Sequence, residues 1–280
     1  MHSRLERTLK MNRTRFKRRT GIYPETFAKM EAVLTRRERA KKKSGRPAAL
    51  SPGEQLLLTL EFWREYRTFA HLGDDWSVHE TTVQRTVERV ETALIQSEEF
   101  RLPGNKSLKQ EENVFQIIAV DAAETPCERP IKKQRRWYSG KKKRHTLKTQ
   151  VVISVTTCMI LSVATAFGSM HDLTLFRHSG VRVHPETALI GDAGYQGIWR
   201  HHGHSVTPHK GTKATPLTPE QRQQNRELAS TRLRVEHVIR RLKIFRVLKD
   251  IYRHRRRRFS LRVNLIAAVC KRLFEAQFMG

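Results

Sequence analysis

The first hundred residues place their apolar side chains at the spacing of amphipathic helices. From about residue 24, apolar positions recur every three or four residues, which predicts a helix. The preceding residues 1–22 are basic and show no such period, so they are predicted to form an N-terminal arm. The charged run 36–46 has no apolar face and is typical of a linker. The periodic positions are Phe27, Met30, Val33 and Leu34.

A second helical segment begins at residue 51. Residues 51–54 (Ser-Pro-Gly-Glu) form a capping-box signature with proline in the first turn. Apolar positions continue through Trp63, and a turn is predicted at 73–77. A further periodic run then extends over residues 78–94.

Two helices joined by a tight turn favour a helix-turn-helix. In that motif the early residues of the second helix contact base edges and phosphates. A generic helical bundle is the alternative, because the pattern is only moderately specific. The residues expected to contact DNA are Thr81, Thr82, Gln84 and Arg85.

The pattern changes after the polar stretch 103–113. From residue 114 the apolar residues cluster in β-branched runs, which are typical of buried strands. We therefore predict an α/β domain over 114–280, preceded by a helical domain over 23–102. Cys158 is expected to be a small core residue of the apolar region. The runs lie at 114–121, 147–157, 159–166 and 187–191.

Helices are also expected in the second half of the chain. Residues 218–221 carry another capping-box signature, which predicts a helix reaching about Lys249. A short helix is predicted over 171–179 with Asp172 as its N-cap, and a last one over 260–278. The basic stretch 132–144, between the first two strand runs, predicts a hairpin or loop.

Three acidic residues occupy distinct places in this pattern. Asp121 and Asp192 each end an apolar run, whereas Glu236 lies inside the long predicted helix. Strand carboxyl ends gather at one edge of an α/β sheet, where ligands usually bind. Gly191 and Gly194 flank Asp192 and permit a tight turn with close approach of a phosphate backbone.

Helix geometry places Glu236 at the edge of a buried face. At about 100° per residue, the apolar positions form one face and the charged ones a stripe directly beside it. An ordinary ion pair between Arg232 and Glu236 is the alternative for this residue taken alone. The three acids taken together favour a catalytic site. The apolar face consists of Leu228, Val235, Ile239 and Leu242, and the stripe of Arg232, Glu236 and Lys243.

Carboxylates at this position favour a metal-dependent reaction. Hard oxygen ligands suit Mg²⁺ or Mn²⁺, and two such ions can stabilise both oxygens of an in-line phosphodiester displacement. Glu124 is a candidate supporting residue. The histidines at 201, 202 and 204 lack a fourth ligand at zinc-like spacing and are interpreted as a polar loop near DNA.

The composition indicates a polyanionic partner. The 280 residues carry a formal net charge of +28, which favours neutralisation of nucleic-acid phosphates. A merely solvated basic surface, or a ribosomal-type binder, would be equally basic without explaining the three acids. Neither a secretion signal nor a membrane span is predicted, and three scattered cysteines favour a reducing, intracellular setting. Further DNA contacts are expected at Lys141, Lys142, Lys143 and Arg144.

At this point the chain resembles the DDE transposases of bacterial insertion sequences, specifically the insertion-sequence-five family, whose relatives include Harbinger-type transposases. The resemblance covers about residues 24–270, including the helical segment before Pro103. The matching stretches are 118–124 (IAVDAAE), 138–146 (YSGKKKRHT), 191–197 (GDAGYQG) and Arg232…Glu236…Lys243.

The resemblance implies an α/β, RNase H-like catalytic core behind an N-terminal α-helical helix-turn-helix domain. It makes Asp121, Asp192 and Glu236 a triad for two Mg²⁺ (or Mn²⁺) ions. Arg232 and Lys243 match basic positions of a tyrosine–arginine–glutamate–lysine signature. The tyrosine position is Ala229 here, which leaves open whether Tyr195 or Tyr138 supplies the aromatic contact.

The activity implied is that of a transposase acting on double-stranded DNA at the bacterial nucleoid. It would bind terminal inverted repeats, cleave phosphodiester bonds at the element ends and join the 3′-hydroxyls to target DNA. A homodimer or larger assembly is expected on paired ends. Two alternatives remain: a nuclease that cuts without joining, and a DNA-binding regulator that is indifferent to Mg²⁺ and to loss of Glu236.

Overall fold

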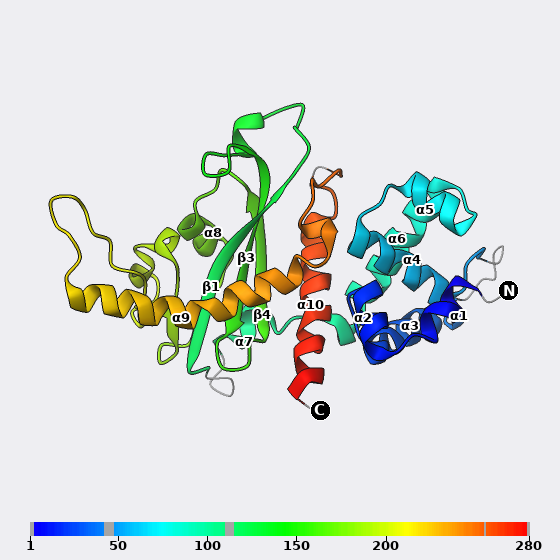
Figure 1. The fold of residues 1–280 in the computed structure, drawn as a ribbon, viewed down its shortest axis with the longest axis horizontal. Coiled ribbons are helices and arrows are strands. Elements are labelled where there is room, and N and C mark those ends of the chain that lie inside the picture. Colours follow the sequence, from blue (N-terminus) through cyan, green and yellow to red (C-terminus); the bar gives the residue numbers. More distant parts are fainter. Residues whose placement is uncertain (1–2, 42–47, 110–114, 255, 279–280) are drawn as a thin grey trace. The chain divides into compact units, whose positions relative to one another are not determined.

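The computed structural model describes residues 3–41, 48–109, 115–254 and 256–278 (Figure 1). The chain divides into two compact units. The helical unit comprises Met1–Arg101, Lys243–Asp250 and Asn264–Gly280, and the sheet unit comprises Leu102–Leu242 and Ile251–Val263. Across the described ranges, no helix combines the length and apolar character needed to cross a bilayer.

The helical unit is built on amphipathic helices with well-formed caps. Ser51 and Glu54 make the predicted capping box, with both reciprocal hydrogen bonds present. The aromatic rings of Phe16 and Phe27 pack edge to face at 5.6 Å in its core. The helices are α1 (Arg4–Leu9), α2 (Arg13–Thr20), α3 (Pro24–Arg39), α4 (Pro52–Glu65), α5 (Phe69–Trp76) and α6 (Glu80–Gln96), with single turns η1 (Glu98–Phe100) and η6 (Arg246–Leu248).

The predicted N-terminal arm is wrong, because α1 and α2 are integral to this unit. Each is capped by a side chain, Ser3 for α1 and Asn12 for α2, and Phe16 is fully buried. Helices of two turns or fewer are too short to display a hydrophobic period, which explains why the sequence pattern did not reveal them.

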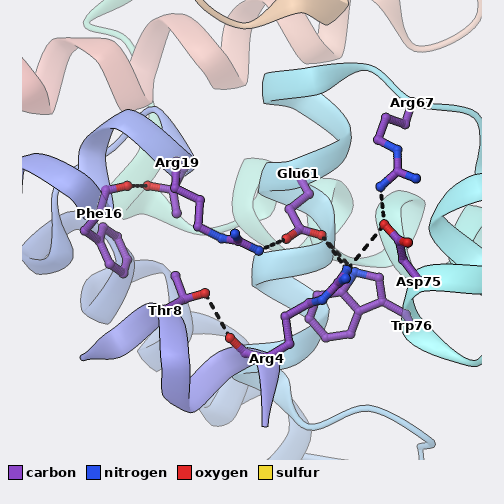
Figure 2. Close-up of polar contacts among 9 residues, drawn as sticks. Arg4, Thr8, Phe16, Arg19, Glu61, Arg67, Asp75 and Trp76 are labelled. Carbon is purple, nitrogen blue, oxygen red and sulfur yellow. Dashed lines mark hydrogen bonds and ion pairs between the residues drawn. The ribbon is translucent and has the colours of Figure 1, made fainter. Parts of the chain in front are cut away.

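A charge network centred on Glu61 joins α1, α2, α4 and α5 (Figure 2). The Glu61 carboxylate accepts a hydrogen bond from Arg19 at 2.6 Å and one from the indole N–H of Trp76 at 2.9 Å. Arg4 lies 3.5 Å from both Glu61 and Asp75, and Arg67 also pairs with Asp75. Arg4 and Arg19, which were predicted to belong to an N-terminal arm, therefore link the helices of this unit.

The predicted linker is also wrong over its first part. Residues 36–39 continue α3, where Arg36 pairs with Glu99 and Arg37 donates to Gln96 at 2.8 Å. The side chains of Arg36 and Arg37 thus find partners in η1 and at the end of α6. Residues 42–46 of the expected linker lie outside the described residues.

The turn of the helix-turn-helix lies later than predicted. Gly73 to Trp76 belong to α5, and the connection to α6 is Ser77–His79. A Cβ at Gly73 would stand 2.6 Å from the carbonyl oxygen of Val78. Glycine here therefore allows the close approach of the turn to α5, rather than forming the turn itself.

The sheet unit contains the predicted α/β fold. Strand β3 pairs antiparallel with β1 on one side and with β4 and β2 on the other, while β1, β5 and β6 are mutually parallel neighbours. This order, three antiparallel strands followed by two parallel ones, confirms the expected RNase H-like core. The strands are β1 (Ile117–Pro126), β2 (Tyr138–Ser139), β3 (Arg144–Ser154), β4 (Ile160–Phe167), β5 (Ala188–Ile190) and β6 (Ser205–Val206).

One face of this sheet carries the core. Ile118, Val120 and Val152 pack with Phe176 and Tyr195 from the segments that cover them. Helix α9 contacts β1 and β3, and crosses these strands in Figure 1. The remaining elements are α7 (Gly104–Ser107), α8 (Asp172–His178), α9 (Pro219–Leu242), α10 (Phe259–Phe278), η3 (Gln134–Arg136), η4 (Ala193–Tyr195) and η5 (Ile198–Arg200).

Several boundaries differ from the predictions. Helix α9 ends at Leu242 rather than near Lys249, and residues 243–250 and 264–280 group with the helical unit instead of the α/β domain. The N-cap of α8 is His171, not Asp172. Cys158 lies half-buried in the turn between β3 and β4 with φ of 56°, so it is not a strand core residue.

Replacing Glu61 with alanine should destabilise the helical unit by about 2 kcal/mol, because the buried indole N–H of Trp76 and the half-buried Arg19 lose their shared acceptor. Urea unfolding followed by circular dichroism measures this loss. Glu25→Ala is the matched control, since it removes an exposed pair with Arg13 and should change stability by less than about 1 kcal/mol. Equal effects of the two variants would contradict the role given to Glu61.

Candidate active site

The pairing of β1 with β5 sets the position of the two aspartates. The strands are parallel, with Ile117 opposite Ala188 and Ala119 opposite Ile190. Continued two residues beyond the last pair, past the end of β5 at Ile190, the same register leads to Asp121 on one side and Asp192 on the other. Asp121 lies within β1 rather than at its end, because β1 continues to Pro126 in partnership with β3 after β5 has stopped.

The surroundings of the half-buried Asp121 carboxylate disfavour its ionised form. Burial raises its pKa to about 6, and the charges of Asp192 and Glu236 act in the same direction. A hydrogen bond from the Ala122 N–H, 2.7 Å long, and the charge of Arg232 oppose the shift. The fold therefore brings Asp192, Glu236 and Arg232 within electrostatic reach of Asp121.

Asp192 caps the turn that follows β5. Its carboxylate accepts the Gly194 N–H at 2.8 Å. A Cβ at Gly194 would stand 2.9 Å from the Asp192 Oδ1 and 2.5 Å from the Asp172 Oδ2, so the missing side chain lets two carboxylates converge. Asp172, expected only to cap a helix, is thus a further acid beside the site.

Asp172 is held in place by a cation from β3. The Lys148 Nζ lies 2.7 Å from the Asp172 Oδ1 and 2.6 Å from the Met170 carbonyl oxygen, and the lysine side chain is only 9% exposed. No local signal in the sequence could reveal this pair, because 24 residues separate its members.

Tyr195 is the aromatic residue that the fold places near these acids. Its ring packs against Gly191 and Phe176, and it is fully buried. Its hydroxyl has no hydrogen-bond partner among the described residues. Burial and the charges of Asp172, Asp121 and Asp192 raise its pKa well above the ordinary value.

Tyr138, the other aromatic residue considered, lies elsewhere. It is exposed on β2 and stacks edge to face on His145.

Helix α9 supplies Glu236 and Arg232. Val235, Val238 and Leu242 are buried, so the buried face includes Val238, which the sequence count had left out. Glu236 is exposed, and in the described part of the chain it forms no ion pair with the half-buried Arg232. The Nε of Arg232 is buried without a hydrogen-bond partner. The alternative of a simple i,i+4 pair is therefore not what the structure contains.

The donor chemistry of this site fits a hard divalent cation. Within the described residues, no three His, Cys, Asp or Glu side chains stand close enough to enclose an ion as they are now oriented. The fit rests instead on charge: burial and the charges of Asp192 and Glu236 disfavour the ionised form of Asp121, a bound cation would relieve that penalty, and Arg232 is the cation of this chain that acts in the same direction. Carboxylate oxygens are the ligands that Mg²⁺ and Mn²⁺ prefer.

The residues predicted to contact DNA in the helical unit lie on the first two turns of α6. Thr81 and Arg85 are exposed, whereas Thr82 and Gln84 are half-buried. Thr82 and Arg85 line a cavity of about 600 Å³ together with Lys41 and Arg89. Arg89 was missed by the sequence analysis, although its position one turn after Arg85 places it on the same face.

The basic hairpin forms as expected between β2 and β3. Residues Lys141 to Arg144 connect or begin these strands and are all exposed. The histidines of the polar loop instead brace the chain before β5: His202 lies 2.7 Å from the Thr187 carbonyl oxygen and His204 lies 3.0 Å from that of Glu186. Glu124 accepts a hydrogen bond from Thr146 at 2.8 Å.

Comparison with protein families identifies both parts of the molecule. Residues 120–274 match the family described as DDE superfamily endonuclease. Residues 48–98 match the helix-turn-helix of DDE superfamily endonuclease. The first match contains the three acids and the second contains the α6 residues.

Two curated relatives extend over most of the chain. A probable transposase for insertion sequence element IS702 from Microchaete diplosiphon is 44% identical over 266 residues, covering 95% of this chain and 96% of that protein. A putative transposase for insertion sequence element IS112 from Streptomyces albus G is 25% identical over 234 residues, covering 82% and 84%. With its sheet order, its acids and these matches, the chain belongs to the DDE superfamily of endonucleases and carries that family's helix-turn-helix.

Proposed function

We propose that this endonuclease is the transposase of an insertion sequence of the insertion-sequence-five type. The helix-turn-helix binds the terminal inverted repeats, and the sheet unit cleaves the element ends and joins their 3′-hydroxyls to target DNA. The observation that carries the proposal is the level placement of Asp121 and Asp192, with Glu236 in electrostatic reach. The relatives, described as probable and putative transposases, support it.

In this proposal Asp121, Asp192 and Glu236 hold two Mg²⁺ or Mn²⁺ ions. When bound, the ions activate the attacking oxygen and stabilise the leaving oxygen of the phosphodiester. Asp121 must lose its proton to serve as a ligand, and the positive charge of Arg232 favours that form. The exposed Glu236 side chain can rotate toward the aspartates because no ion pair fixes it.

The basic side chains position the substrate in the same proposal. Thr81, Thr82, Gln84 and Arg85 contact the inverted repeats, and the hairpin residues Lys141 to Arg144 contact backbone phosphates. Arg232 and Lys243 flank Glu236 in sequence and hold the strand beside the reacting bond. Pairing two element ends requires at least a homodimer, acting at the bacterial nucleoid.

Glu236→Ala and Asp192→Asn should each abolish Mg²⁺-dependent cleavage of a labelled duplex carrying the element end, while leaving its affinity for that duplex unchanged. Each variant removes a metal ligand without touching the helix-turn-helix. Glu227→Ala is the matched control, because Glu227 is an exposed acid of the same helix bonded only to Gln223 among the described contacts.

Cleavage that survives Asp192→Asn would contradict the site. Cleavage without joining of the 3′-hydroxyls would favour a nuclease, and sequence-specific binding without any Mg²⁺-dependent cleavage would favour a regulator.

Asp121→Asn should stabilise the metal-free protein at pH 7.5 and remove the stabilisation by Mg²⁺. A carboxyl whose pKa is raised from 3.8 to about 6 on folding loses stability as the pH rises through that window, up to about 3 kcal/mol. Asparagine avoids this loss but cannot serve as an anionic ligand. Melting temperatures at pH 3.5 and 7.5 measure both effects. A variant no more stable than wild type at pH 7.5 would contradict the strained carboxylate.

Tyr195→Phe should leave the metal-free unfolding free energy within about 1 kcal/mol of wild type, because the hydroxyl it removes has no protein partner. We expect the concentration of Mg²⁺ needed for half-maximal cleavage to rise, since the hydroxyl lies among acids that it can orient. An unchanged Mg²⁺ requirement would assign Tyr195 a packing role only.

A further inference from the structure

The sheet unit contains a cavity that none of the three acids lines. It lies between the edge strand β4 and the first turn of α10 and encloses about 670 Å³. Its floor is formed by Ala164 to Phe167 of β4. Its charged side chains are Arg136, His178, Arg256 and Arg258, and we call it the arginine pocket.

In this pocket the guanidinium groups of two arginines contact the ring of Phe167. The Arg136 guanidinium lies 4.8 Å from the centre of the Phe167 ring, and that of Arg256 lies 5.1 Å from it. The edge-to-face contact of Trp137 at 4.9 Å fixes the ring. Cation–π attraction therefore holds two like charges close together.

Among the described residues, no carboxylate balances the guanidinium groups of Arg136 and Arg256. No acidic residue lines the pocket, and within the described ranges neither Arg136 nor Arg256 forms an ion pair with a carboxylate. The pocket also includes Phe259 to Leu261, the first turn of α10, where the helix dipole adds partial positive charge. The positive charges of this pocket therefore favour the binding of an anion.

The chemistry favours phosphate over a base. Guanidinium forks match phosphate oxygens and bind them with two parallel hydrogen bonds. The Phe167 ring already contacts two guanidinium groups and Trp137, so base stacking on it would compete with these contacts. Both Arg136 and Arg256 are exposed, so a phosphate of a long duplex can reach them.

We propose that the arginine pocket binds the backbone phosphates of DNA, as a contact separate from α6 and from the acidic site. The inference rests on the proposed function, because it takes DNA as the ligand. Contacts to phosphate position a duplex without reading its sequence. The pocket therefore contributes equally to binding of element and unrelated DNA.

The test compares two variants that remove the same charge from the full-length protein. Arg136→Gln with Arg256→Gln removes two positive charges from the pocket. Arg135→Gln with Arg177→Gln removes two neighbouring exposed arginines that do not line it. Fluorescence anisotropy with a labelled duplex of unrelated sequence gives the affinity over a series of salt concentrations. The single Arg136→Gln variant serves if the pocket double variant does not fold.

The pocket variant should show a salt dependence shallower by about one to two units of log–log slope than wild type, because each phosphate contact contributes about 0.9. The control should stay near the wild-type slope. A pocket variant with the slope of the control would overturn the inference. Mg²⁺-dependent cleavage by the wild type is scored separately, so loss of the pocket effect and failure of the proposed endonuclease chemistry are distinguishable.

Discussion

The parallel pairing of β1 with β5 is the constraint on which the site depends. Three residue pairs fix the register, and that register brings Asp121 level with Asp192 just beyond the point where β5 ends. Burial of the Asp121 carboxylate is the main cause that raises its pKa to about 6, and the charge of the neighbouring Asp192 adds to it. A bound cation would relieve the penalty on the ionised Asp121 carboxylate, so the arrangement fits a cation-binding site. Two features oppose this rise in pKa, the hydrogen bond from the Ala122 N–H and the charge of Arg232 from α9.

The helical unit has to fold a helix-turn-helix in a very basic segment of the chain. Glu61 and Asp75 gather arginines from three segments, so that part of the positive charge is used inside the unit (Figure 2). Arg85 and Arg89 remain on the outer face of α6. The division of charge between internal pairing and exposed surface explains how a chain with a net charge of +28 can fold and still keep cations on its surface.

The sequence predicted the features that depend on local pattern. Capping at Ser51 and strand-like runs around Asp121 and Asp192 led to the right fold class, as did the helix bearing Glu236. The predictions from sequence were wrong where contacts between distant segments determine the structure. Strand β1 extends past Asp121 because β3 pairs with it as far as Pro126, although Ala122 to Thr125 is not an apolar run. Asp172, Lys148 and Tyr195 meet only through the fold, and α1 and α2 are too short to show a period.

The most direct test of the central account is the pKa of Asp121 in the metal-free protein, followed by carbon-detected NMR in the wild type and in Asp192→Asn. If the strand register brings the two carboxylates level, Asp121 titrates near pH 6 in the wild type. Removing the neighbouring charge then lowers its pKa, while burial keeps it above the ordinary value of 3.8. A wild-type pKa near 3.8, or one that does not respond to Asp192→Asn, would contradict the account.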